Sequence, residues 1–282
     1  MNADIPRTAD PQPTADPVAS RPIRDRFRVR FAKVGLLRWI GHRDLQRLWE
    51  RLLRRVGLPL AMTEGFHPKP RVGFPSALAL GVEGLDEVVE IEVTRELSSS
   101  ELHAALVADD QPGLEIGEVR LVARAAADGT PDPTFANLAK AKLHSSEYEL
   151  EIPEAYLNEV RPAAQIDAAI DEAKSHGAIR FVRKGREVTA GIPAPLALLD
   201  RRDNTLALSI VEDAGTSLKP TEVLQGIGLS DLIEHGGILR RTRVILVDEV
   251  VDQTSAPTGE LAANPAANHR NIPSDTLQQE RS

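Results

Sequence analysis

The spacing of apolar residues changes along this chain, and that change constrains its fold more than any other feature. From Phe27 to Phe31 apolar residues alternate with arginines, which is typical of a strand with one buried side. From Arg43 to Val56 they recur at intervals of three and four, which predicts a helix with one buried face. Gly57 and Pro59 are expected to end that helix. The folded part therefore begins with a strand and an amphipathic helix.

The rest of the sequence continues this mixture of patterns. In the first half we predict further strands at 60–63, 71–74, 87–93 and 114–122 and a helix at 99–108. In the second half we predict strands at 147–152, 179–182, 187–192, 206–211 and 241–247 and helices at 166–175 and 220–225. Both series follow approximately the β-α-β-β-α-β order of a ferredoxin-like unit. The sequence thus predicts an α+β protein of two tandem ferredoxin-like modules, at 25–140 and 141–251.

Both ends of the chain differ in composition from this middle part. Residues 1–24 hold five prolines, residues 252–282 hold three, and neither stretch contains an aromatic residue. Such segments cannot bury enough apolar surface to offset the entropy lost on ordering. We therefore predict disordered tails at 1–24 and 252–282.

The absence of cysteine excludes several kinds of chemistry. Without it the chain has no disulfide, no thiolate zinc site, no cysteine nucleophile and no iron–sulfur cluster of its own. The histidines are scattered without metal-ligand spacing, so we expect no metal site. No apolar run approaches the roughly 18 residues of a membrane span, and the N-terminus lacks the apolar core of a signal peptide. We expect a cytoplasmic protein that does not enter a membrane.

The charge distribution is uneven although the net charge is −8. Residues 21–73 contain 14 of the 34 Lys and Arg residues but only 4 of the 42 Asp and Glu residues, a local excess of +10. Five of these arginines share the polar face of the predicted first helix, namely Arg43, Arg47, Arg51, Arg54 and Arg55. Such a stripe is either a solvated surface or a site that neutralises phosphates. The local excess favours binding of an anionic partner such as RNA.

The loop at 63–77 is a second candidate site. Prolines on both sides of Lys69 restrict its path and present His67, Lys69 and Arg71 in a limited geometry. Phe66 and Phe74 either stack on bases or belong to the local core. We predict that this loop binds nucleic acid or a protein partner beside the helix.

His42, at the start of the first helix, is a candidate acid–base group. It either acts on a phosphodiester or helps to cap the helix, and capping is the simpler interpretation. The glycine pairs at 226–228 and 236–237 lack the spacing of a phosphate-binding loop, and no nucleophile elbow occurs. We therefore assign no catalytic residue and keep His42 as an alternative.

The order of motifs between Arg26 and Val93 resembles that of the radical SAM-linked (radical SAM-associated) domain family, a domain of unknown function. The stretches that carry the resemblance are the basic strand, H-x-D-L at 42–45, R-R-x-G-L-P at 54–59, E-G-F-H-P-K-P at 64–70 and S-A-L-A-L-G-V-E at 76–83. R-K-G-R at 183–186, K-P-T-E-V-L at 219–224 and R-T at 241–242 match more loosely. The resemblance implies an accessory protein of a radical SAM enzyme. The iron–sulfur cluster and S-adenosylmethionine then belong to the partner, because this chain has no cysteine.

Three hypotheses about function follow from these features. The leading one is a non-catalytic module that binds an anionic substrate such as RNA or tRNA for the radical SAM enzyme. The second is a protein–protein adaptor for that enzyme without nucleic acid. The third is a metal-independent ribonuclease that uses His42, since the predicted architecture is similar to that of repeat-associated (RAMP) endonucleases, some of which place a histidine near the first helix. Fold alone does not decide among them.

Overall fold

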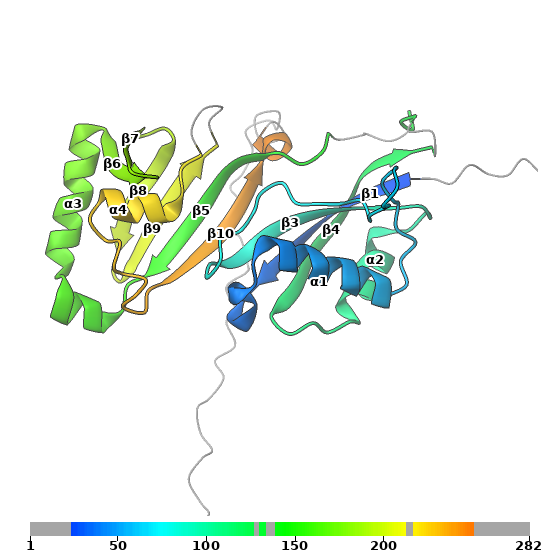
Figure 1. Ribbon diagram of the computed structural model, residues 1–282, viewed down its shortest axis with the longest axis horizontal. Helices are drawn as coiled ribbons and strands as arrows, with labels where there is room; N and C mark the ends of the chain where they lie inside the picture. Colours follow the sequence, from blue (N-terminus) through cyan, green and yellow to red (C-terminus); the bar gives the residue numbers. More distant parts are fainter. Residues whose placement is uncertain (1–23, 127–129, 134–138, 213–216, 251–282) are drawn as a thin grey trace, which may run out of the picture.

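The computed structural model describes residues 24–126, 130–133, 139–212 and 217–250. They form an α+β fold in which a long, mostly antiparallel sheet carries few helices (Figure 1). The strand order is β4-β1-β3-β10-β5-β9-β8, with the short β2 also paired to β3, and β6 and β7 form a separate two-stranded sheet. The predicted α+β class is confirmed.

The first half of the chain contains the strand and helix that the apolar spacing predicts. Phe27, Val29 and Phe31 are buried and form a core with the leucines and Trp49 of the first helix. That helix begins and ends one residue earlier than predicted. The elements of this half are β1 (Arg24–Lys33), a 3₁₀ turn η1 (Gly35–Trp39), α1 (His42–Arg55), β2 (Val72–Gly73), β3 (Glu83–Val93), α2 (Ser99–Val107) and β4 (Leu114–Ala125).

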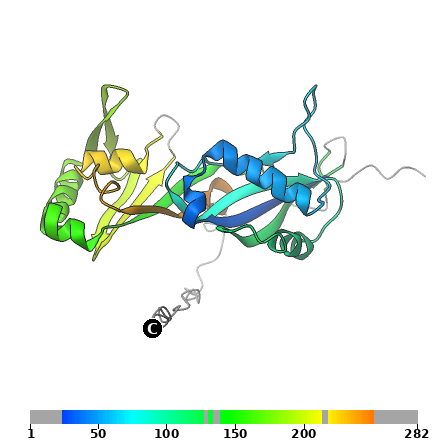
Figure 2. The ribbon, with the colours of Figure 1, turned by 60° about the horizontal axis from the view of Figure 1, so that its bottom comes forward.

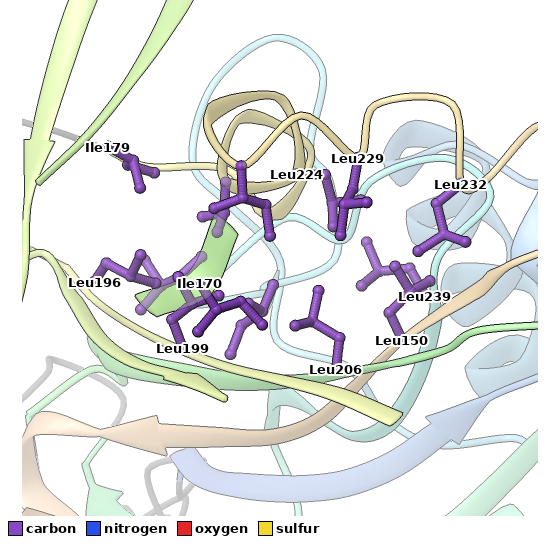
Figure 3. Close-up of a cluster of buried hydrophobic side chains, with 14 of the residues drawn as sticks. Leu150, Ile170, Ile179, Leu196, Leu199, Leu206, Leu224, Leu229, Leu232 and Leu239 are labelled. Carbon is purple, nitrogen blue, oxygen red and sulfur yellow. The ribbon is translucent and has the colours of Figure 1, made fainter. Parts of the chain in front are cut away.

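The second half has its own core, in which leucines and isoleucines from strands and helices meet (Figure 3). Leu150, Leu199 and Leu206 line the sheet side of this core, and Ile170 and Leu224 cover them from two helices. Its elements are β5 (Leu143–Glu151), a π-helical turn η2 (Tyr156–Val160), α3 (Ala163–His176), β6 (Ala178–Arg183), β7 (Arg186–Gly191), β8 (Leu196–Arg202), β9 (Thr205–Val211), α4 (Pro220–Gly226) and β10 (Ile238–Leu246).

A short parallel pairing joins the sheets of the two halves. Strand β2 pairs only with Glu90 and Ile91 near one end of β3. Near the other end, β10 pairs in parallel with β3, where Arg240 lies opposite Glu83 and Arg241 lies opposite Gly84. The last strand of the chain therefore lies beside the first half.

The second half departs from the sequence prediction at β8. The predicted strands at 179–182 and 187–192 exist, but they form the separate β6–β7 hairpin, and the unpredicted β8 pairs with β9 instead. The stretch Leu196–Leu199 is an apolar run without alternation, and the pairing register shifts between Leu196 and Leu198. A period-two pattern therefore does not reveal this strand.

The predicted tails lie outside the described residues, except that Arg24, assigned to the N-terminal tail, is the first residue of β1. Within the described ranges, no helix combines the length and the apolar character that crossing a bilayer requires.

Candidate functional site

The arginines of α1 lie on the face of the helix that points away from the core. The opposite face is buried through Leu45, Leu48, Trp49, Leu52 and Leu53. The side chains of Arg43, Arg47, Arg51, Arg54 and Arg55 are all exposed. The structure thus brings these predicted residues together as one stripe, here called the α1 arginine stripe, and α1 runs along the outside of the first half in Figure 2.

The arginines of this stripe differ in how far they are already paired. Arg47 lies 3.1 Å from Asp44, but both side chains are more than half exposed, so the pair is weak. Arg55 donates to both oxygens of Asp109, at 2.8 and 2.5 Å, and this hydrogen bonding lowers the pKa of Asp109. Within the described residues Arg43 and Arg51 form no ion pair. Arg55 therefore ties α1 to the end of α2, while Arg43, Arg47 and Arg51 face solvent.

The loop that follows α1 forms a narrow projection. The amide of Thr63 donates to the carbonyl of Lys69 at 2.8 Å, and the amide of Lys69 donates to Thr63 Oγ1 at 3.0 Å. Figure 2 shows this segment extending beyond the C-terminal end of α1. Its tip exposes Phe66 completely, and His67 and Lys69 are exposed beside it.

Two residues of the predicted loop site point elsewhere. Arg71 donates from Nε to the carbonyl of Met62 at 3.1 Å and lies 3.8 Å from Glu92, so it braces the base of the projection. Phe74 packs against Phe31 and His42, with ring centroids 6.3 and 5.4 Å apart. Phe66 is thus accessible for stacking, whereas Phe74 extends the core.

The local excess of positive charge is partly neutralised by distant residues. Arg28 pairs with Glu90 at 3.0 Å and with Asp248 at 2.9 Å. Arg30 pairs with Asp86 and Glu249, both at 2.5 Å. Arg28 and Arg30 of β1 are therefore already paired, whereas α1 and the projection carry exposed positive charge.

A cavity of about 620 Å³ opens where the two halves meet. The stretch after β2, strands β5 and β10, and the start of α4 contribute to its wall. Three stretches that the sequence singles out converge there: residues 76–79, residues 219–221 and Arg241. A volume of this size falls in the range of about 300–1,000 Å³ that is common for small-molecule sites.

Arg241 and Glu87 form a buried ion pair at this junction. Their side chains are 2% and 4% exposed. Arg241 donates from Nε to Glu87 Oε1 at 2.7 Å and from Nη2 to Glu87 Oε2. It also donates from Nη1 to Ser76 Oγ at 3.0 Å. Burial opposes the charge, but Glu87 raises the pKa of Arg241, so the guanidinium stays charged. The pair holds the Ser76 wall of the cavity against β10.

His42 and Lys33 lie close to this pair. Lys33 is buried and donates from Nζ to the carbonyl of Ile40 at 3.1 Å, and burial lowers its pKa. Nδ1 of His42 is buried and has no hydrogen-bond partner among the described residues. Burial and the positive charges of Arg241 and Lys33 lower the pKa of His42, and Glu87 opposes them. His42 is thus favoured as the neutral ring, which is packed edge-on against Phe74.

The cavity lining combines apolar and polar groups that the sequence analysis did not select. Leu78, Leu218 and Leu239 line it with Tyr148 and Ser146. Lys142, Lys219 and Glu212 also line it, and all three are exposed. Leu78 and Lys219 lie in stretches that carry the family resemblance described above. The same stretches and the R-T pair include Ser76 and Arg241, which line the same cavity. Within the described residues no three His, Asp or Glu side chains are grouped to hold a metal ion.

The described residues define an α+β protein with an outward-facing basic helix and a cavity between its halves. The chain matches the family described as "Uncharacterized protein conserved in bacteria" (DUF2344) over residues 26–220, and it belongs to that family. The curated proteins include no match to it. Among solved structures, one titled "Crystal Structure of an Unknown Protein from Galdieria sulphuraria" is 12% identical, covers 79% of this chain and 99% of that chain, and has a TM-score of 0.23.

Proposed function

We propose that this protein is a non-catalytic accessory module that binds RNA, such as tRNA, and presents it to a radical SAM enzyme in the cytoplasm. The observation that carries the RNA-binding part is the α1 arginine stripe, in which Arg43, Arg47 and Arg51 are exposed on one helix face. Guanidinium groups match phosphate oxygens in a fork geometry. Their four-residue spacing places successive charges along one line that an RNA backbone can follow.

The projection after α1 supports the same function. Phe66 is fully exposed at its tip, with His67 and Lys69 exposed beside it. An exposed aromatic ring next to a cation is the combination by which proteins stack on unpaired bases. We propose that the stripe holds the RNA backbone while the projection contacts an unpaired base.

The proposal also includes the partner and the architecture. The main-sheet strands of each half are adjacent in the order fourth, first, third, second, as β4-β1-β3-β2 and β10-β5-β9-β8. This order supports two tandem ferredoxin-like modules, with the β6–β7 hairpin inserted in the second. The radical SAM partner rests on the resemblance of the motifs between Arg26 and Val93. Because this chain has no cysteine, the iron–sulfur cluster in this proposal belongs to the partner.

The test is RNA binding by a charge-reversed stripe. We expect Arg47→Glu/Arg51→Glu to weaken binding of purified bulk tRNA and to make the log–log salt dependence shallower by about 1.4–1.8, at about 0.7–0.9 per lost phosphate contact. The matched control is Arg180→Glu/Arg202→Glu, which reverses two exposed arginines of the second half. Equal binding by the stripe variant and the wild type would contradict the proposal.

Two experiments on the same purified protein test the adaptor and ribonuclease hypotheses. Affinity capture of the tagged protein that recovers a radical SAM enzyme without RNA would favour the adaptor. Cleavage of structured RNA in EDTA that disappears in His42→Gln would favour the ribonuclease. RNA recovered with the wild type and lost with the stripe variant supports substrate presentation.

A further inference from the structure

We infer that the cavity between the two halves is a binding site for a single nucleotide, taking its base inside and its phosphate at the rim. The inference rests on the proposed RNA-binding function and deepens it, because the nucleotide would be one unpaired residue of the bound RNA. It is carried by the shape of the cavity, its unsatisfied polar group and its arrangement of charges.

The wall of the cavity suits a flat, partly apolar body. Leu78, Leu218 and Leu239 are buried side chains that line it, and Tyr148 adds an aromatic ring. A base is an apolar plane with polar edges, and aromatic side chains stack on such planes. A long acyl chain would instead leave the buried Oγ of Ser146 without a partner.

The hydroxyl groups of the wall favour a ligand with both donors and acceptors. Ser76, Ser146 and Tyr148 line the cavity, and Ser217 and Thr221 add further hydroxyls. Ser146 is buried, and its Oγ has no hydrogen-bond partner among the described residues. A buried polar group without a partner costs free energy, and a ligand edge can supply the missing bond. A hydroxyl serves equally as donor or acceptor, which matches the mixed edge of a base.

The charges at the cavity have both signs. Arg241 is neutralised by Glu87, so it adds little attraction for an anion. Lys142 and Lys219 are exposed and form no ion pair within the described residues, whereas Glu212 is a carboxylate on the same lining. Lysines bind phosphate as point charges, and a carboxylate accepts from the N–H groups of a base. A nucleotide combines these two features, whereas a simple anion would leave Glu212 without a donor.

The N-terminal end of α1 lies near the cavity. Phe74 stacks edge-on against His42, the first residue of α1, and the next residue, Pro75, already lines the cavity. Arg43, at the start of the stripe, directly follows His42 in the chain. We infer that a strand of RNA that follows α1 toward its N-terminus would come close to the cavity.

Titration calorimetry of the intact protein tests this with AMP, GMP, CMP and UMP, and with ribose 5-phosphate and inorganic phosphate as fragments. We expect at least one of the four nucleotides to bind, and both fragments to bind at least about tenfold more weakly. Lys142→Ala/Lys219→Ala should weaken nucleotide binding about tenfold or more, because it removes both phosphate contacts. Ser146→Ala should weaken it more modestly, and the control Lys174→Ala/Lys184→Ala, which removes exposed lysines outside the cavity, should leave it unchanged.

Three results would overturn the inference. These are no binding of any nucleotide, phosphate binding as tightly as the nucleotides, or cavity variants that bind like the wild type while circular dichroism shows them folded. Bulk tRNA separates this failure from failure of the proposed function. If tRNA binds through the stripe but no nucleotide binds, only the cavity inference fails. If nucleotides bind but tRNA does not, the RNA-binding proposal fails together with the assignment of the nucleotide to a bound RNA, and the cavity remains a site for free nucleotides.

Discussion

Replacing Arg241 with methionine leaves the Glu87 carboxylate buried without its guanidinium. The structure gives this pair two hydrogen bonds in a site that is almost fully inaccessible, plus a third bond from Arg241 to Ser76. Removing one partner of a buried pair costs about 3–5 kcal/mol, because the remaining charge stays desolvated. We expect that loss for Arg241→Met and a similar loss for Glu87→Met. Either is a large part of the roughly 5–15 kcal/mol that stabilises an ordinary domain.

The double variant separates this explanation from a simple loss of contacts. With both members of the pair replaced by apolar side chains, neither charge is left buried without the other, so Glu87→Met/Arg241→Met should be within about 2 kcal/mol of the wild type. The two losses are thus strongly non-additive, as residues in direct contact are. Urea unfolding followed by the fluorescence of buried Trp49 and by circular dichroism measures all four proteins.

The control is the exposed pair Asp44–Arg47, whose replacement by methionines should cost less than about 1 kcal/mol at each position. The reasoning is refuted if each single variant at Arg241 and Glu87 loses less than about 1 kcal/mol, or if the double variant loses the sum of the two single losses.

Two further predictions concern the same region. The pKa of His42 is lowered from 6.5 in the folded protein, so the unfolded chain binds more protons just below that pH. The free energy of unfolding of the wild type, relative to that of His42→Gln, should therefore fall as the pH drops through 6.5. Urea unfolding of both proteins across that range measures this difference, and a difference that does not change with pH would contradict the prediction. Gly84→Ala would place its Cβ 2.5 Å from Glu87 Cγ and should lower the free energy of unfolding by about 1–3 kcal/mol. Gly73→Ala, whose Cβ would lie in open space, should change the free energy of unfolding by no more than about 0.5 kcal/mol. Equal thermal stability of the two variants would show that Glu87 moves aside freely.

Local patterns predicted much of the fold because they reflect burial on single elements. The alternation at 27–31 reflects the burial of one side of a single strand, and the apolar spacing from Leu45 to Leu53 reflects the burial of one face of a single helix. Strand β8 lacked such a pattern, since its apolar run faces both ways around a register shift. The order of elements was therefore predictable, and the identity of the strand beside β9 was not.

The charges and the cavity depended on contacts between distant parts of the chain. Arg28 and Arg30 contributed to the predicted basic excess, yet their partners include Asp248 and Glu249, about 220 positions away. Glu87 and Arg241 are 154 positions apart, and neither sequence neighbourhood indicates the other. The arginine stripe of α1 could be predicted because a helix repeats locally. The cavity could not, because four separate stretches of the chain have to meet before it exists.

Because β10 is the last strand of the sheet to be synthesised and pairs with β3, the cavity forms only late in synthesis. A ribosome completes β1, β3 and β4 long before β10, and N-terminal parts of a chain fold first as they emerge. Until β10 arrives, Glu87 lacks its guanidinium partner and the cavity lacks the wall formed by Leu239 and Arg241. An incomplete chain can thus display the arginines of α1 without offering the cavity. If the proposed partner enzyme engages the filled cavity, it would select finished molecules over nascent ones.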